Sequence, residues 1–282
     1  MHDHGTPADL AGTIRSYDFV RELDTFEVRR PLAGRSVRVE RWLASARGSQ
    51  GDRLVYVLDE PLDGEERSRL CGYLGALSEM APGRTAAPEA AGLENGFVWI
   101  ASPFVGHGTA MLTLDRLAEE RDTLAPNEVD RAICQLLDTT ESARDAGIAH
   151  GPVSYGEPTV DRGGRVVLEL PGLGRALDGL SRVNPELVRD EVRSIVELGY
   201  RIAVGLPAGE SPLRPSRLNR RLGRSWDLWF EQGLDPSRGF ETPAEARLAL
   251  PSATTEAAVV EGAGLRFLGR RKRAEVDQSP TA

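Results

Sequence analysis

Lysine is almost absent from this sequence. Of its 35 basic residues 34 are arginine, and the only lysine is Lys272, near the end of the 282 residues. Arginine is always charged and presents a broad planar fork, whereas lysine carries a compact ammonium group whose pKa shifts readily. Chemistry that requires a lysine amino group is therefore excluded from everything that precedes Lys272.

Cysteine and long apolar runs are also scarce. Cys71 and Cys134 are the two cysteines, and neither has the spacing of a metal site, so we expect reduced thiols and no disulfide framework. No stretch approaches the roughly 20 apolar residues that a membrane-spanning helix needs. The first residues lack the basic start and apolar run of a signal peptide. We therefore expect a soluble, cytoplasmic protein with no membrane span.

Positive charge is in deficit overall. The chain has 35 basic and 43 acidic residues, a net charge of −8. Nucleic-acid-binding proteins normally carry a basic surface, so we predict no nucleic-acid partner. Residues 270–273 (Arg-Arg-Lys-Arg) are a local exception within residues 251–282, which we predict to be a flexible tail. This basic cluster either aids solubility or contacts an acidic partner or a lipid surface.

The first hundred residues favour strands with one helix. Residues 1–15 are polar and predicted to be disordered. Residues 17–60 suggest strands, with the densest apolar run at 54–58. Residues 65–80 repeat apolar side chains at helical spacing, and residues 81–91, rich in proline, glycine and alanine, indicate a loop. A buried strand is predicted at residues 96–102.

After residue 110 the pattern becomes mostly helical. Two brief strands are predicted at residues 157–160 and 165–170, with a turn between them. The predicted helices are residues 113–120, a longer one that begins at Pro126, residues 192–204, one around residues 226–233, and residues 242–250. Trp226, Trp229 and Phe230 form an aromatic stripe, which is more typical of core than of a binding surface. The order of elements predicts an α+β chain with two unequal lobes.

Four segments, in order, resemble bacterial serine/threonine protein kinases. They are residues 97–105 with the following helix, residues 143–150 (Ala-Arg-Asp-Ala-Gly-Ile-Ala-His), residues 161–177 and residues 233–245. The resemblance covers residues 16–250. It implies a strand-rich N-lobe at 16–101, a hinge at 102–106 and a helical C-lobe at 107–250.

The resemblance also implies which residues occupy the catalytic loop. The family's His-Arg-Asp motif falls on His150-Gly151-Pro152, so a proline replaces the general base. Ser154 replaces the lysine, and Glu157 replaces the asparagine that holds a metal ion. Proline has no group that accepts a proton, and a single carboxylate makes a poor magnesium site.

Three further kinase elements are missing by the same comparison. The Asp-Phe-Gly motif falls on Leu170-Pro171-Gly172, and the neighbouring Glu169 is expected to point to the opposite face if the strand continues. Gly34 is the only glycine between residues 16 and 43, so no glycine-rich phosphate loop is present. The phosphate-clamping lysine falls near Leu58. Its glutamate partner falls near Gly72, with Glu65, Glu66 and Glu79 as acids that the sequence does not place.

Other residues with family counterparts are predicted to be structural. His150 is expected to pack and hydrogen-bond, and not to act in catalysis. Arg238 is predicted to pair with Glu186, and Glu191, or Asp190 beside it, to anchor the catalytic loop. Ser181 is the only hydroxyl between Gly172 and Glu186, which leaves little room for a phosphorylated activation loop.

Together these losses predict a pseudokinase, a regulatory or scaffolding module that binds a protein partner and has no catalytic, cofactor-binding or metal-binding residues. ATP binding is not expected, because Leu58 and Leu170 would form an apolar cleft floor that leaves phosphate charges uncompensated. The alternative is a kinase-like enzyme that retains nucleotide binding or phosphoryl transfer through residues such as Glu157 and Glu169. A third possibility is an unrelated α+β interaction domain.

Overall fold

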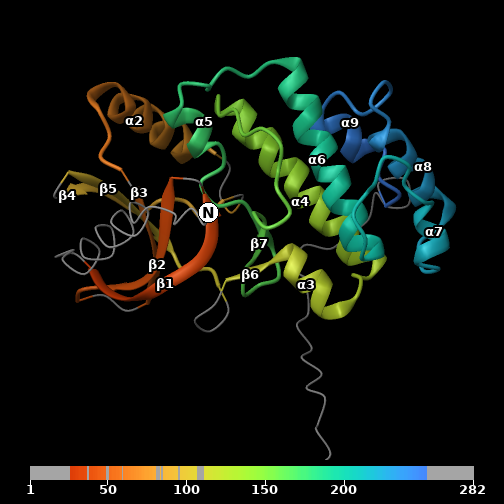
Figure 1. Cartoon of the computed structure of the whole chain (residues 1–282), viewed down its shortest axis with the longest axis horizontal. Coiled ribbons are helices and arrows are strands. Elements are labelled where there is room, and N and C mark those ends of the chain that lie inside the picture. Colours follow the sequence, from red (N-terminus) through yellow and green to blue (C-terminus); the bar gives the residue numbers. More distant parts are fainter. Residues whose placement is uncertain are drawn as a thin grey trace, which may run out of the picture.

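The computed structural model describes residues 26–252, except residues 37, 49–50, 59, 81–82, 84, 95 and 107–110. The chain forms a strand-rich lobe that carries one helix and a larger helical lobe beside it (Figure 1). The predicted two-lobed α+β fold is therefore confirmed. The predicted disordered start at residues 1–15 and all but two residues of the predicted tail lie outside the described residues. The lobe limits proposed from the sequence stay predictions.

The strand-rich lobe is built on a five-stranded antiparallel sheet of order β1-β2-β3-β5-β4. Its strands are β1 (Phe26–Ser36), β2 (Val39–Ala46), β3 (Asp52–Leu58), β4 (Ala90–Glu94) and β5 (Phe97–Pro103). Side chains alternate between the two faces of a strand. In β3, Leu54, Tyr56 and Leu58 face the helix and the other lobe, whereas Val55 and Val57 pack on the outer face with Trp42 and Trp99.

The predicted loop at 81–91 is wrong at its end, because β4 begins at Ala90 and pairs with β5. This strand consists largely of small residues, so it shows no apolar alternation. Gly92 lies opposite Trp99, and a Cβ atom on Gly92 would come within 2.4 Å of the Trp99 ring. The bulk of Trp99 therefore requires the small residue opposite it.

The helix of this lobe, α2 (Gly64–Glu79), confirms the helix predicted for residues 65–80. A capping box fixes its start: the Asp63 side chain accepts from the Glu66 amide, and the Glu66 side chain accepts from the Asp63 amide. These contacts satisfy two amides that the helix end leaves free. Leu70, Tyr73 and Leu77 face inward and pack against the sheet.

The helical lobe has a small three-stranded sheet and seven helices among the described residues. The strands, in the order β6-β7-β8, are β6 (Leu112–Thr113), β7 (Thr159–Val160) and β8 (Val166–Val167). The helices are α3 (Leu114–Arg121), α4 (Pro126–Asp145), α5 (Leu173–Leu177), α6 (Pro185–Val204), α7 (Pro215–Leu218), α8 (Arg224–Leu234) and α9 (Pro243–Leu248). Trp226, Trp229 and Phe230 of α8 are buried in the core of this lobe, as predicted.

Helix α6 is the centre of that core and is longer than predicted. It begins at Pro185 and not at residue 192, with Asn184 as its N-cap. Val188 and Glu191 are buried in its first two turns, while most neighbouring side chains there are exposed. This mixed pattern hid the helix start from an analysis based on apolar runs. None of the helices in the described ranges is both long enough and apolar enough to cross a membrane.

Candidate functional site in the cleft between the lobes

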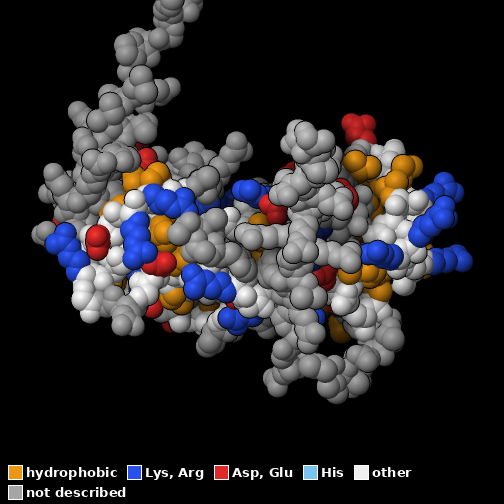
Figure 2. All heavy atoms as spheres, turned by 90° about the horizontal axis from the view of Figure 1, so that it is seen from below, with side chains coloured by type: hydrophobic (Ala, Val, Ile, Leu, Met, Phe, Trp, Pro, Cys, Tyr) orange, Lys and Arg blue, Asp and Glu red, His pale blue; other side chains and the backbone are white. Residues whose placement is uncertain are grey.

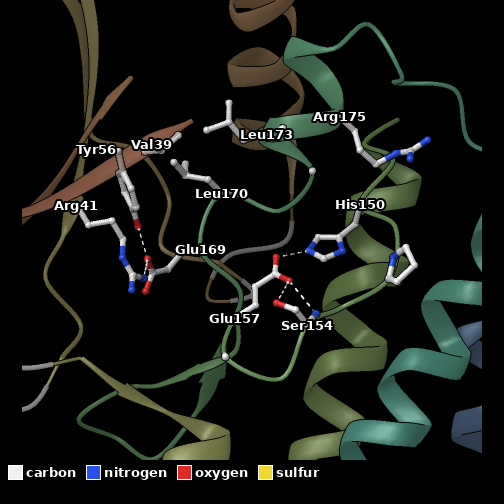
Figure 3. Close-up of a pocket in the computed structure, with 14 residues that line it drawn as sticks. Val39, Arg41, Tyr56, His150, Ser154, Glu157, Glu169, Leu170, Leu173 and Arg175 are labelled. Carbon is white, nitrogen blue, oxygen red and sulfur yellow. Dashed lines mark hydrogen bonds and ion pairs between the residues drawn. The ribbon is translucent and has the colours of Figure 1, made fainter. Parts of the chain in front are cut away.

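A cavity of about 360 Å³ lies between the two lobes. Its walls come from β2 and β3 and from two loops of the helical lobe (Figure 3). The lining residues are Val39, Arg41, Tyr56, His150, Pro152, Ser154, Gly156, Glu157, Glu169, Leu170, Gly172, Leu173, Gly174 and Arg175. The structure thus brings together the two loops that the sequence analysis identified as the catalytic loop and the metal-binding segment.

Arg41 and Tyr56 are the residues that the sequence analysis missed. They are partners in the β2–β3 register, so their side chains leave the sheet next to each other on one face. Arg41 Nη1 donates to Glu169 Oε2 at 2.7 Å, and the Tyr56 hydroxyl donates to the same oxygen at 3.1 Å (Figure 3). We call Arg41, Tyr56 and Glu169 the cleft network. It connects the two lobes directly.

The cleft network is shielded from water. The side chains of Arg41 and Glu169 are 10% and 6% exposed, so each charge needs the other. Burial and the negative charge of Glu169 raise the pKa of Tyr56 well above its ordinary value. The Tyr56 hydroxyl therefore keeps its proton at neutral pH and donates a hydrogen bond to Glu169.

Glu169 and Leu170 both line the cavity, so the opposite orientation predicted for Glu169 in a continuing strand does not apply here. The reason is local backbone geometry. Strand β8 ends at Val167, and Leu170 has a φ of 41°, which breaks the alternation of a strand. Gly172 follows with a φ of 78° and caps α5. A Cβ atom there would lie 2.8 Å from the Ala149 carbonyl oxygen.

His150 is held by acceptors at both ring nitrogens. Nδ1 lies 2.7 Å from the Gly151 carbonyl oxygen, and Nε2 lies 2.9 Å from Glu157 Oε1. A carbonyl and a carboxylate both accept, so the imidazole fits this site as a doubly protonated cation. Burial opposes that charge, but the hydrogen bond and charge of Glu157 outweigh it and raise the pKa of His150 to about 9. The side chain is buried and fully engaged, as expected of a structural residue.

Glu157 and Glu191 complete this buried cluster. Burial alone would raise the pKa of Glu157, but its contacts with His150 and with the Ser154 amide lower it. Glu191 lies on α6 with a carboxylate oxygen 3.8 Å from His150 Nδ1. Burial raises the pKa of Glu191 to about 7. Glu191 is therefore the buried acid that faces the loop, while Asp190 is exposed.

Leu58 and Leu170 belong to the same buried cluster, but only Leu170 is among the residues that line the cavity. They are 1% and 6% exposed. Of the two leucines predicted to form an apolar cleft floor, Leu170 alone reaches the cavity, and charged side chains form much of the remaining wall. Arg41 and Glu169 supply charge on one side, and His150 and Glu157 on the other.

The acids of α2 serve the helix and its neighbours. Glu66 caps the helix and accepts from Arg38 at 3.1 Å, and Glu65 pairs with Arg69. Neither these two nor Glu79 is among the residues that line the cavity, and Gly72 is exposed. In the described part of the cleft, therefore, no acid of α2 takes the place of the glutamate that pairs with the phosphate-clamping lysine in kinases.

The predicted pair between Arg238 and Glu186 is wrong. Arg238 instead pairs with Asp235, three residues before it, at 2.9 Å. Asp235 and Arg238 lie in the same turn, so Arg238 reaches this acid without a contact to Glu186 of α6. Ser181 lies exposed in the segment between α5 and α6.

The two carboxylates of the alternative metal site, Glu157 and Glu169, are each paired with a cation from the chain itself. Glu169 is paired with Arg41, and Glu157 with His150. Within the described ranges no group of three or more histidine, cysteine, aspartate or glutamate side chains is arranged so that it could hold a metal ion. The arrangement favours internal charge neutralisation over binding of a cation.

The comparisons with known proteins agree with this architecture. No family model matches the sequence, and no curated protein is similar to it. Solved structures match in fold, and that fold is the protein kinase domain.

The matching structures include the kinase domain of Mycobacterium tuberculosis PknI. One crystal structure of it is 19% identical with a TM-score of 0.60, and the match covers 81% of this chain and 96% of that chain. Another is 19% identical with a TM-score of 0.62, covering 83% and 97%. At this identity the matches establish the fold and not the activity.

Proposed function

We propose that this protein is a pseudokinase, a kinase-fold module that regulates or scaffolds a protein partner and does not transfer phosphate. The observation that carries the proposal is the cleft network. Two bulky side chains, Arg41 and Tyr56, extend from the sheet into the cleft and bind Glu169 of the other lobe. A nucleotide that displaced Arg41 or Glu169 would break a buried ion pair, which is costly.

The residues at the expected catalytic positions support the same proposal. Pro152 has no proton-accepting group, and Leu58 and Leu170 are packed into a buried apolar cluster. Phosphoryl transfer depends on positioned phosphates, metal ions and a base. None of these three side chains supplies such a function. Lys272, the single lysine, follows the kinase-like region.

The test is a thermal-shift titration with ATP, with and without magnesium or manganese. A ligand that binds the folded state with a Kd of about 10 µM would, at 1 mM, stabilise it by about 2.7 kcal/mol. For a domain of this size the melting temperature would rise by roughly 5–10 °C. We expect no shift. A metal-dependent rise of several degrees would overturn the proposal.

The double variant Leu58→Lys with Leu170→Asp sharpens this test. Both side chains are almost fully buried, so two charges placed there should lower the melting temperature without creating ATP binding. A variant that keeps its melting temperature and binds ATP would show that only these two residues prevented binding.

The alternative is an enzyme that uses Glu157 and Glu169 in place of the standard metal ligands. The feature in its favour is that both carboxylates line one cavity. This alternative predicts that the wild-type protein transfers phosphate from labelled ATP and that Glu157→Gln or Glu169→Gln abolishes the transfer. We expect background activity in the wild-type protein with either metal, because both carboxylates are already paired.

A further inference from the structure

A strongly basic segment lies far from the cleft, around α7. Residues 211–226 contain five arginines and no acidic residue, in a chain whose net charge is −8. The five are Arg214, Arg217, Arg220, Arg221 and Arg224. All five side chains are exposed. We call them the arginine patch.

Among the residues that the structure describes, the arginine patch contains no ion pair, whereas many other arginines do form one. Elsewhere arginines such as Arg38, Arg201 and Arg247 pair with acids. None of the five patch arginines forms a side-chain hydrogen bond or ion pair with any residue in the described ranges. Unpaired like charges so close together repel one another, so their clustering is unfavourable unless something anionic binds.

The patch is held on a fixed framework. Asp227 of α8 accepts from both the Ser216 amide at 2.8 Å and the Ser216 hydroxyl at 2.6 Å. Asn219 is buried and donates to the Ala203 carbonyl at 2.9 Å. Tyr200 donates to the Leu213 carbonyl at 2.9 Å. These contacts anchor the segment at three points, so its arginines are displayed on ordered backbone.

A pocket of about 450 Å³ adjoins the patch. Tyr200, Phe230 and Leu234 give it apolar walls, and Leu213 and Arg214 bring the basic segment to its edge. Leu213 and Leu228 are 57% and 56% exposed. Figure 2 shows arginine and hydrophobic side chains gathered together at the end of the molecule that α7 and α8 form.

We propose that the arginine patch and this pocket dock an acidic segment of a partner protein, with one apolar side chain of that segment in the pocket. Arginine binds carboxylates with paired hydrogen bonds, and an apolar pocket takes an anchoring side chain. The inference names the partner chemistry of the binding role proposed above and rests on it.

The apolar walls of the pocket favour a peptide over other polyanions as the ligand. A single apolar side chain fits a bounded pocket, whereas a phosphodiester backbone or a lipid headgroup has none to offer. Four acidic residues line the pocket as well: Glu210, Asp227, Glu231 and Asp235. They would repel a continuous anion but accommodate a peptide whose acidic run is confined to the arginine side.

The test is fluorescence anisotropy with a labelled synthetic peptide, a run of acidic residues followed by a phenylalanine, titrated with the full chain without nucleotide. The triple variant Arg217→Glu, Arg220→Glu and Arg221→Glu should weaken binding by at least about tenfold. The matched control is the triple variant Arg30→Glu, Arg47→Glu and Arg182→Glu. It changes the net charge by the same amount, but at exposed arginines outside the arginine patch. It should change affinity less than about twofold. Replacing the peptide's phenylalanine with serine should also weaken binding, because the pocket is then left unfilled.

Three outcomes would overturn the proposal: no binding of the peptide, equal loss in both triple variants, or patch-dependent binding of anionic vesicles or an oligonucleotide with none of the peptide. All substituted side chains are exposed, so the variants should keep the wild-type circular dichroism spectrum and melting temperature. The nucleotide titration is separate from this measurement. ATP binding would contradict the pseudokinase proposal while leaving peptide docking intact, and loss of peptide docking would leave the nucleotide result unchanged.

Discussion

At the scale of single residues, His150 is where charge and burial are most closely linked. The imidazole is enclosed, and yet acceptors at both ring nitrogens favour its charged form. Its folded-state pKa of about 9 lies above the ordinary value of 6.5. The charged form therefore stabilises the folded protein fully below pH 6.5, and that contribution disappears as the pH rises to 9.

We predict that the free energy of unfolding falls by roughly 3 kcal/mol between pH 6.5 and pH 9 because His150 loses its proton. Glu191, whose pKa of about 7 is raised, acts in the same direction but mainly between pH 4.5 and 7. Urea unfolding at a series of pH values measures this slope. His150→Gln should remove most of it above pH 7.

Glu157→Gln is the companion variant for that experiment. It removes the charge that raises the pKa of His150 above 6.5, so the fall in the free energy of unfolding between pH 6.5 and pH 9 should shrink. A slope above pH 7 that is unchanged in both variants would contradict the assignment to His150.

Sequence reasoning found His150, Glu157 and Glu191 but not Arg41 and Tyr56. The first three follow from a resemblance along the chain. Arg41 shares the inward face of β2 with Val39 and Leu43, and this alternation along the strand was the one local indication that Arg41 points inward. Nothing local to Arg41 points to a partner 128 residues away. Ion pairs between distant segments arise from tertiary packing, which a pattern along one strand does not encode.

At the scale of elements, two glycines at the start of α5, one that caps the helix and one inside it, have opposite requirements. Gly172 has a left-handed φ of 78°, and a Cβ there would meet the Ala149 carbonyl oxygen at 2.8 Å. Gly174 lies two residues further, inside the helix, and a Cβ there would meet nothing within 4 Å. Alanine substitutions at these two glycines therefore test whether the turn into α5 requires a left-handed backbone.

Gly172→Ala should lower the free energy of unfolding by about 2 kcal/mol or more, because it adds left-handed strain and a backbone clash. Gly174→Ala is the matched control and should raise it by about 0.5–1 kcal/mol, since alanine favours the helix and limits the unfolded chain. Denaturant unfolding measures both. Equal effects of the two substitutions would show that the turn tolerates a side chain.

Element limits were predicted well where a local signal marks them. Pro126 marked the start of α4, and apolar spacing marked α2. Strand β4 was missed because its small residues lack alternation, and it exists through pairing with β5. The early start of α6 was missed because the apolar run begins late, although Asn184 and Pro185 form a typical helix start.

At the scale of the whole molecule, the two lobes were predictable from the order of elements, but the contact between them was not. The cleft network joins β2 and β3 to the segment after β8 through a buried ion pair. Removing one partner of such a pair leaves the other charge buried and unpaired.

Glu169→Ala should therefore lower the free energy of unfolding by about 3 kcal/mol or more, because Arg41 and Tyr56 both lose their acceptor. The matched control is Glu120→Ala, whose pair with Arg116 has side chains that are 68% and 55% exposed. That change should cost about 0.5 kcal/mol or less. Urea unfolding followed by circular dichroism compares them, and a loss in Glu169→Ala as small as in the control would mean that the network does not hold the lobes.

The four tryptophans are divided evenly between the lobes. Trp42 and Trp99 pack on the outer face of the sheet, and Trp226 and Trp229 lie in α8. All four are buried, the most exposed being Trp99 at 8%. Each lobe thus carries its own intrinsic fluorophores, whose emission changes when water reaches them. Replacing either pair with phenylalanine would leave a protein whose ultraviolet fluorescence reports on one lobe alone, so the order in which the lobes unfold is open to a purely optical measurement.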